Sequence, residues 1–298
     1  MPTPTLPKGG GIPLTKSKRL KPNYLFMNLK ITIIQSELHW ENVDKNLAMF
    51  TEKIASIKEE IDLIVLPEMF TTGFTMNSSS LAETMDGKSV LWMKSQAKSK
   101  NAVIVGSLII EENHAYFNRL IWAQPDGKIY HYDKRHLFRM ANEHKHFSAG
   151  KTRLIVELKG WKICPLICYD LRFPVWSRNK PITHYPTPTT HPSQPAYDCL
   201  IYIANWPEAR KEPWSKLLEA RAIENQVYVV GVNRIGTDGK DISYSGNSAI
   251  IDPKGNKISA VQEHQNTIET IVLNRQELED FREKFPVGLD GDDFEILH

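Results

Sequence analysis

Residues 162–174, Lys-Ile-Cys-Pro-Leu-Ile-Cys-Tyr-Asp-Leu-Arg-Phe-Pro (KICPLICYDLRFP), are the stretch that decides the fold. The run 162–167 is short and apolar, as is typical of a buried strand. It ends at Cys168, after which we expect the chain to turn from strand into helix. In open α/β sheets, reactive groups gather where strands end at their carboxyl edge. The stretch therefore predicts a buried strand that carries a candidate nucleophile at its end.

Strand-like and helix-like segments alternate on both sides of this stretch. Apolar runs predict further strands at 29–34, 62–66, 102–110, 199–204, 227–232 and 248–252, and a hairpin of 118–123 with 128–133 around Gln-Pro-Asp-Gly. Apolar residues from Val43 to Ile61 recur at steps of four and three, which predicts a helix with one buried stripe. Two more helices are expected at about 212–225 and 275–284. This order predicts an α/β layered fold with a mixed sheet, in a single domain.

Two segments do not fit the alternation. Residues 1–26 contain five prolines, a Gly-Gly-Gly run and no apolar region of the kind found in secretory signals. We expect them to be a disordered N-terminal leader or extension, placed before a catalytic domain at 27–298. The segment at about 180–195 holds five of the 18 prolines, which disfavours both a helix and an inner strand. It is expected to be a proline-rich surface insertion.

Composition excludes several classes of protein. The chain has 298 residues, of which 41% are apolar and 24% charged, so disordered and collagen-like proteins are excluded. No apolar stretch is long enough for a membrane span, so no membrane partner is expected. The net charge of +2 comes from the leader, because residues 27–298 contain 32 basic and 35 acidic residues; no nucleic-acid partner is expected. Three cysteines favour a reducing, cytoplasmic location.

Three of the strand-like runs end in a chemically reactive residue: Glu68, Lys134 and Cys168. Strand ends at one edge of a sheet can meet in space although they are far apart in sequence. A thiol is a strong nucleophile once it loses its proton, and a nearby carboxylate can accept that proton. A lysine ammonium, together with backbone N–H groups after Cys168, can stabilise the oxyanion of a tetrahedral intermediate.

Each of these residues also has a structural interpretation when it is taken alone. Cys168 could be a small buried hydrophobe, Glu68 a cap, and Lys134 a solvated surface residue. Other classes of protein explain these residues less well. A Cys–His hydrolase would leave Glu68 and Lys134 idle, and a metal site built from the histidines 131, 136, 144 and 146 lacks the usual ligand spacing. The third alternative is a non-catalytic small-molecule binding protein with the same fold.

The residues around the three strand ends carry a specific resemblance. LPEMF (66–70), DKRHLF (133–138) and ICYDLRFP (167–174) resemble the three signature blocks of the nitrilase superfamily of carbon–nitrogen hydrolases, in the same order. The resemblance implies a four-layer αββα sandwich, a Glu–Lys–Cys triad of Glu68, Lys134 and Cys168, and no metal or organic cofactor. It also implies a homodimer or higher homo-oligomer formed through the outer helices. Many members use a second glutamate, and Glu143 is the matching position here.

The residues after Cys168 indicate a branch of the superfamily. CYDLRFP (168–174), IANWPEAR (203–210) and ARAIENQ (220–226) are similar to the amidase branch, especially to bacterial omega-amidases. The resemblance implies hydrolysis of the terminal amide of 2-oxoglutaramate or 2-oxosuccinamate to a dicarboxylate and ammonia, through a cysteine thioester. A different small aliphatic amide or N-carbamoyl compound is the alternative substrate.

Such a substrate carries a carboxylate at the end away from its amide, so its pocket needs a fixed cation. The planar guanidinium of arginine binds carboxylates with two hydrogen bonds. Arg210 follows the predicted strand 199–204 and is the first candidate; Arg172 is the second, although it could instead pair with Asp170. Phe74 and Trp206 are candidate pocket walls, and the backbone N–H of Tyr169 is a candidate oxyanion donor.

Overall fold

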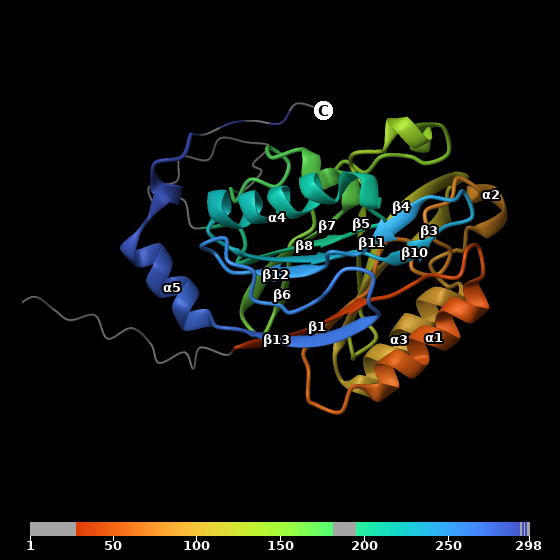
Figure 1. Cartoon of the computed structure of the whole chain (residues 1–298), viewed down its shortest axis with the longest axis horizontal. Coiled ribbons are helices and arrows are strands. Elements are labelled where there is room, and N and C mark those ends of the chain that lie inside the picture. The colour runs from red at the N-terminus through yellow and green to blue at the C-terminus, as the bar shows by residue number, and fades with distance from the viewer. Residues whose placement is uncertain (1–27, 181–194, 293, 295, 297–298) are drawn as a thin grey trace, which may run out of the picture.

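The chain folds into two β-sheets that pack face to face, with helices on both outer faces (Figure 1). A computed structural model describes residues 28–180, 195–292, 294 and 296. The predicted leader at 1–26 lies outside the described residues, as does nearly all of the predicted insertion at 180–195. The two sheets and the helices that cover them form a single domain, as the sequence predicts.

The larger sheet has six strands and contains the N-terminal half of the fold. Its order is β13 (Thr267–Leu273), β1 (Leu29–Gln35), β2 (Leu63–Val65), β3 (Val103–Glu112), β4 (Ala115–Ala123) and β5 (Ile129–Asp133). Strands β1, β2 and β3 are parallel, whereas β4 is antiparallel to both of its neighbours. The carboxyl ends of β2 and β5 therefore lie at the same edge.

The second sheet has five strands. The stretch 162–174 forms one of these strands and continues into the segment at the carboxyl edge of the sheet. Its order is β12 (Ala249–Ile251), β9 (Tyr228–Val232), β8 (Cys199–Ile203), β7 (Trp161–Ile167) and β6 (Val156–Leu158). Strands β7, β8 and β9 are parallel, so residues that follow them lie together. A separate hairpin is formed by β10 (Ile235–Thr237) and β11 (Ser243–Ser245).

Helices cover the outer face of each sheet (Figure 1). Helices α1 (Val43–Ser56) and α3 (Lys88–Lys100) lie on the six-stranded sheet, and α4 (Lys211–Asn225) lies on the five-stranded sheet. The layers are thus helix, sheet, sheet, helix. The remaining helices are α2 (Ser78–Leu81), α5 (Arg275–Lys284) and the short 3₁₀ helices η1 (Arg139–Ala141), η2 (Glu143–Lys145), η3 (Cys168–Arg172), η4 (Glu208–Arg210) and η5 (Val287–Leu289).

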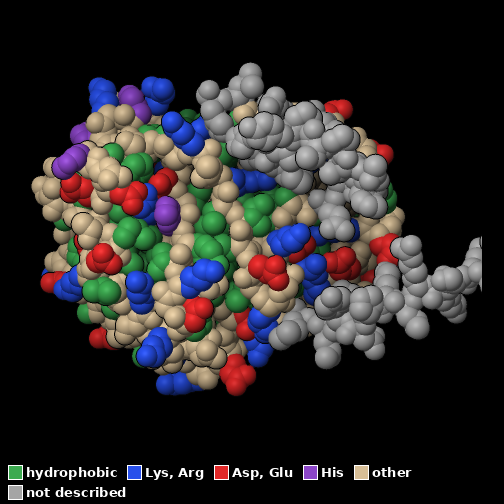
Figure 2. Space-filling view, turned by 180° about the vertical axis from the view of Figure 1, so that it is seen from behind, with side chains coloured by type: hydrophobic (Ala, Val, Ile, Leu, Met, Phe, Trp, Pro, Cys, Tyr) green, Lys and Arg blue, Asp and Glu red, His purple; other side chains and the backbone are tan. Residues whose placement is uncertain are grey.

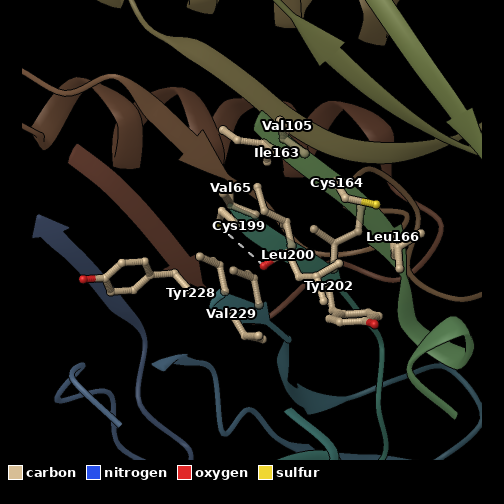
Figure 3. Packing of buried hydrophobic residues seen from close by; sticks show 14 of the residues in the cluster. Val65, Val105, Ile163, Cys164, Leu166, Cys199, Leu200, Tyr202, Tyr228 and Val229 are labelled. Carbon is tan, nitrogen blue, oxygen red and sulfur yellow. Dashed lines mark hydrogen bonds between the residues drawn. The ribbon is translucent and has the colours of Figure 1, made fainter. Parts of the chain in front are cut away.

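The core between the sheets is made of alternating strand residues. Figure 3 shows Val65 and Val105 of the six-stranded sheet beside Ile163 and Cys199 of the five-stranded sheet, and all four are buried in one cluster. Side chains alternate between the two faces of a strand, so the neighbour of Cys199, Leu200, is directed to the opposite face. Because both faces of the central strands are covered, these strands are apolar throughout, which is why the sequence predicts them well.

The structure corrects the sequence prediction at several elements. The helix predicted over 43–61 ends at Ser56 because Ile57 takes an extended conformation, although Ile57 and Ile61 remain buried. Helix α3, with mixed polarity, was not predicted, and neither were α2, β6, β13 and the β10–β11 hairpin. These elements are short or half exposed, so their apolar pattern is weak.

The surface shows mixed charge. On the face opposite to that of Figure 1, basic side chains are interspersed with acidic ones among the described residues (Figure 2). Within the part of the chain that the structure describes, none of the helices combines the length and hydrophobicity that crossing a bilayer requires.

Candidate active site

Glu68, Lys134 and Cys168 meet where the carboxyl edges of the two sheets come together. Glu68 lies three residues after β2, Lys134 follows β5 directly, and Cys168 follows β7 directly. The Lys134 Nζ atom lies 2.9 Å from Glu68 Oε1. All three side chains are buried. The structure thus brings together the three residues that the sequence places at strand ends.

The Glu68 carboxylate is held by donors from three directions. Its Oε1 atom accepts hydrogen bonds from Lys134 and from the side-chain amide of Asn118 at 2.7 Å. Its Oε2 atom accepts the backbone N–H of Asn205 at 2.8 Å. Asn118 and Asn205 are site residues that sequence reasoning missed; Asn205 stands inside the quoted block 203–210, whereas nothing in the sequence distinguishes Asn118.

Cys168 has an unusual backbone and a protonated thiol. Its φ angle is +44°, in the left-handed region that non-glycine residues rarely adopt, as the chain turns from β7 into η3. Burial raises the pKa of the Cys168 thiol well above its ordinary value; the charge of Glu68 adds to the rise, and the Lys134 ammonium opposes it. The Cys168 Sγ atom donates a hydrogen bond to the Asn205 carbonyl oxygen at 4.0 Å, and hydrogen bonding with Glu68 makes the smallest contribution to the rise in pKa. At neutral pH Cys168 is therefore a protonated thiol close to the Glu68 carboxylate.

Lys134 is a buried cation between two carboxylates. Its Nζ atom lies 3.0 Å from both oxygens of Glu143, in addition to its contact with Glu68. Burial by itself would lower the pKa of Lys134, but Glu143 and Glu68 outweigh burial and raise the pKa. Lys134 is therefore charged at neutral pH. Glu143, on η2, is fully buried, and its carboxylate also accepts the backbone N–H of Phe138 at 2.5 Å.

A cavity of about 690 Å³ opens beside Cys168. It is lined by all five residues that the sequence assigns to substrate binding: Phe74, Tyr169, Arg172, Trp206 and Arg210. The Arg172 guanidinium lies over the Trp206 ring at 5.1 Å, and the Arg210 guanidinium lies over Phe138 at 5.4 Å. Both arginines thus have their charged ends at the cavity.

One alternative for Arg172 is wrong. The sequence allowed it to be a structural partner of Asp170, but the oxygens of Asp170 bind Tyr132, His136 and Ile167 instead. The reason is that Asp170 is directed into the protein, whereas Arg172 is exposed at the cavity.

The β10–β11 hairpin supplies a cavity wall that sequence reasoning missed. Asp238, Lys240, Ile242 and Tyr244 all line the cavity. Asp238 accepts hydrogen bonds from the backbone N–H groups of Lys240 and Ile242 and from the Tyr244 hydroxyl, which fixes the tip of the hairpin. The turn residues Asp-Gly at 238–239, between residues of strand character, were the available signal.

The histidines do not form a metal site in the described part of the chain. No group of three or more His, Cys, Asp or Glu side chains is arranged there to hold a metal ion. His136 instead donates its backbone N–H to Asp170 and stacks on the Phe173 ring at 3.7 Å.

Comparison with known proteins agrees with this fold. The carbon–nitrogen hydrolase family matches residues 30–283. The chain is 44% identical over 268 residues to the omega-amidase YafV of Escherichia coli K12, which covers 90% of this chain and 98% of YafV. It is 34% identical over 265 residues to the 2-oxoglutaramate amidase of Bacillus subtilis, covering 88% of this chain and 96% of that enzyme.

A solved structure shows the same architecture. The crystal structure of XC1258 from Xanthomonas campestris, a CN-hydrolase superfamily protein with an arsenic adduct in its active site, has a TM-score of 0.85 and 41% identity. The match covers 91% of this chain and 99% of XC1258. The chain therefore belongs to the carbon–nitrogen hydrolase family, in the nitrilase superfamily. Within that family it is a hydrolase of omega-amidase type, which acts on carbon–nitrogen bonds outside peptides.

Proposed function

We propose that the protein hydrolyses the terminal amide of a small 2-oxo dicarboxylic acid monoamide, 2-oxoglutaramate or 2-oxosuccinamate, through a thioester on Cys168. The observation that supports this most is the buried Lys134–Glu68 pair, 2.9 Å apart, next to Cys168 in a cavity lined by two arginines. The names of the omega-amidase and 2-oxoglutaramate amidase relatives support the choice of substrate.

The proposed chemistry follows from the charges in the site. Because the Cys168 thiol is protonated at rest, Glu68 takes its proton as the sulfur attacks the amide carbonyl. The Lys134 ammonium and the backbone N–H of Tyr169 stabilise the oxyanion that forms. Glu68 then gives the proton to the departing ammonia, which leaves a thioester. The same carboxylate activates the water that releases the acid, and Glu143 keeps Lys134 in place.

A substrate panel tests this function. We expect purified protein to release ammonia from 2-oxoglutaramate and 2-oxosuccinamate with higher kcat/KM than from glutamine, aliphatic amides or N-carbamoyl amino acids. The α-keto acid group and its carboxylate allow the preferred substrates to form contacts that a plain aliphatic amide such as butyramide cannot form. Faster turnover of an N-carbamoyl amino acid or a plain aliphatic amide would favour the alternative substrate class. Absence of turnover on the whole panel would favour a binding protein.

We assign the substrate carboxylate to Arg210. The carbonyl of Arg210 accepts a hydrogen bond from Trp206 Nε1 at 2.7 Å, so its backbone is fixed at the cavity wall. Since residues 27–298 carry more acidic than basic residues, a local cation has to attract an anionic substrate. Replacing one partner of a charged hydrogen bond costs about 2–5 kcal/mol. We expect Arg210→Ala to raise the KM for 2-oxoglutaramate by roughly 30- to 4,000-fold, since about 1.4 kcal/mol is tenfold.

Two other cavity cations provide matched controls. Arg172→Ala and Lys240→Ala each remove a positive charge from the same cavity, and we expect smaller effects on KM. Turnover of butyramide, which has no carboxylate, should change little in Arg210→Ala. The assignment fails if Arg210→Ala leaves the KM unchanged while Arg172→Ala raises it.

We also propose a homodimer or higher homo-oligomer formed through the outer helices, and a reducing, cytoplasmic location. Ile223 on α4 and Val175 after η3 are about half exposed, at 55% and 54%, which leaves apolar surface for a partner protomer. Cys164, Cys168 and Cys199 are all free thiols, as a reducing compartment favours. Sedimentation velocity would contradict the dimer by showing a monomer at micromolar concentration.

A further inference from the structure

The carboxylate of Asp170 is fully buried two residues after Cys168 and accepts four hydrogen bonds. Its Oδ2 atom lies 2.8 Å from the Tyr132 hydroxyl and 3.0 Å from the backbone nitrogen of Ile167. Its Oδ1 atom lies 3.0 Å from the backbone nitrogen of His136 and 2.8 Å from the His136 ring nitrogen Nδ1. Nothing in the proposed chemistry uses this buried anion.

The partners of Asp170 belong to two separate segments of the site. Tyr132 and His136 stand two residues before and two residues after Lys134, whereas Ile167 directly precedes Cys168. The Lys134 segment follows β5 of the six-stranded sheet, and the Cys168 segment follows β7 of the five-stranded sheet. β5 and β7 belong to different sheets and share no backbone hydrogen bonds, so the Asp170 side chain is what connects their carboxyl ends here.

We propose that Asp170 is a positioning residue that fixes the Lys134 ammonium relative to the Cys168 sulfur, by binding the chain on both sides of Lys134 and directly before Cys168. This inference rests on the roles proposed above for Lys134 and Cys168. Asp170 touches neither the substrate cavity nor the reacting atoms, and it acts through the two residues that it places.

The surroundings of Asp170 support a rigid connection. The Tyr132 hydroxyl that donates to Asp170 also accepts the indole N–H of Trp176 at 3.0 Å, and the His136 ring stacks on Phe173 at 9° between planes. Burial raises the pKa of Tyr132 well above its ordinary value, and Asp170 adds to this, so the hydroxyl remains a donor. A small displacement of a reacting group can cost on the order of 10²-fold in rate, which makes such a connection consequential.

The first test compares two buried tyrosines. Tyr132→Phe removes one donor to Asp170 while Asp170 itself is retained. Tyr228→Phe is the matched control, because Tyr228 is also buried and donates its hydroxyl to the Asn274 carbonyl at 3.3 Å, at the amino end of β9 and away from the Asp170 contacts. We expect Tyr132→Phe to lower kcat for 2-oxoglutaramate roughly 10-fold with little change in KM, and Tyr228→Phe to leave both unchanged. Equal kcat in the two variants would overturn the proposal.

The second test uses iodoacetamide alkylation of Cys168, which needs no amide substrate and so stands apart from the proposed function. The Lys134 ammonium lowers the pKa of the Cys168 thiol. Because Asp170→Asn displaces Lys134, the thiolate fraction at neutral pH should fall and alkylation of Cys168 should slow by about 10-fold or more. In a Lys134→Ala background, Asp170→Asn should have no further effect on the alkylation rate, because the residue through which Asp170 acts is gone. An equal slowing in both backgrounds would mean that Asp170 only stabilises the fold.

Discussion

Cys168→Ala is expected to abolish turnover of every amide substrate, with a loss of on the order of 10⁴-fold or more in kcat. Without the sulfur no thioester forms, and the remaining groups can only polarise the carbonyl. Alanine keeps the Cβ atom, so the strain of the positive φ at position 168 is the same in both proteins. We expect a folded, inactive protein. Ammonia release and circular dichroism would measure the two properties.

A second cysteine provides the control for this variant. Cys199 is fully buried in the core between the sheets, away from the cavity residues, so Cys199→Ala should cost roughly 0.5–3 kcal/mol of stability with little loss of turnover. Intact-mass analysis of a trapped reaction should show one acyl adduct on the wild type and none on Cys168→Ala. Turnover that survives in Cys168→Ala would contradict the thioester scheme.

The parts of the fold that the sequence predicts well are the buried parallel strands. Strands β1, β7, β8 and β9 are mainly apolar and are buried over nearly their whole length, so a short apolar run identifies each of them without any tertiary information. The same property locates Glu68 and Cys168, which are the first reactive residues after such runs, whereas Lys134 follows the half-exposed edge strand β5. The three side chains then meet because the strands that precede them, β2, β5 and β7, run toward the same end of the fold.

The sequence does not show which polar residues hold Glu68, Lys134 and Cys168 in place. Asn118 binds Glu68 from β4 of the same sheet, and Asn205 binds it from the segment after β8, a contact that depends on how the two sheets pack. The β10–β11 hairpin is short and half exposed, so its apolar pattern is weak although it forms a wall of the cavity. The shape of the cavity therefore depends in part on the elements that are hardest to predict.

Glu68→Gln is expected to change turnover and thiol reactivity in opposite directions. Turnover should fall on the order of 10²–10⁴-fold, because glutamine can neither accept the thiol proton nor give a proton to the departing ammonia. The negative charge and hydrogen bond of Glu68 raise the pKa of Cys168, so their removal should lower that pKa while Lys134 still stabilises the thiolate. At a pH below the wild-type pKa, a larger fraction of thiolate then forms, and iodoacetamide should alkylate the variant faster than the wild type.

The opposite signs separate a chemical role for Glu68 from a structural one. The two oxygens of Glu68 accept from Lys134, Asn118 and Asn205, so a glutamine N–H₂ group faces a donor in either orientation and some stability is lost. Partial unfolding would lower turnover too, but it would not leave an alkylation profile with a single midpoint at lower pH. Glu143→Gln is the matched control, because it also removes a carboxylate from Lys134 and Glu143 has no described hydrogen bond to Cys168. Turnover by Glu143→Gln should fall less than turnover by Glu68→Gln. If Glu68→Gln kept wild-type turnover, the proton carrier in this site would have to be another group.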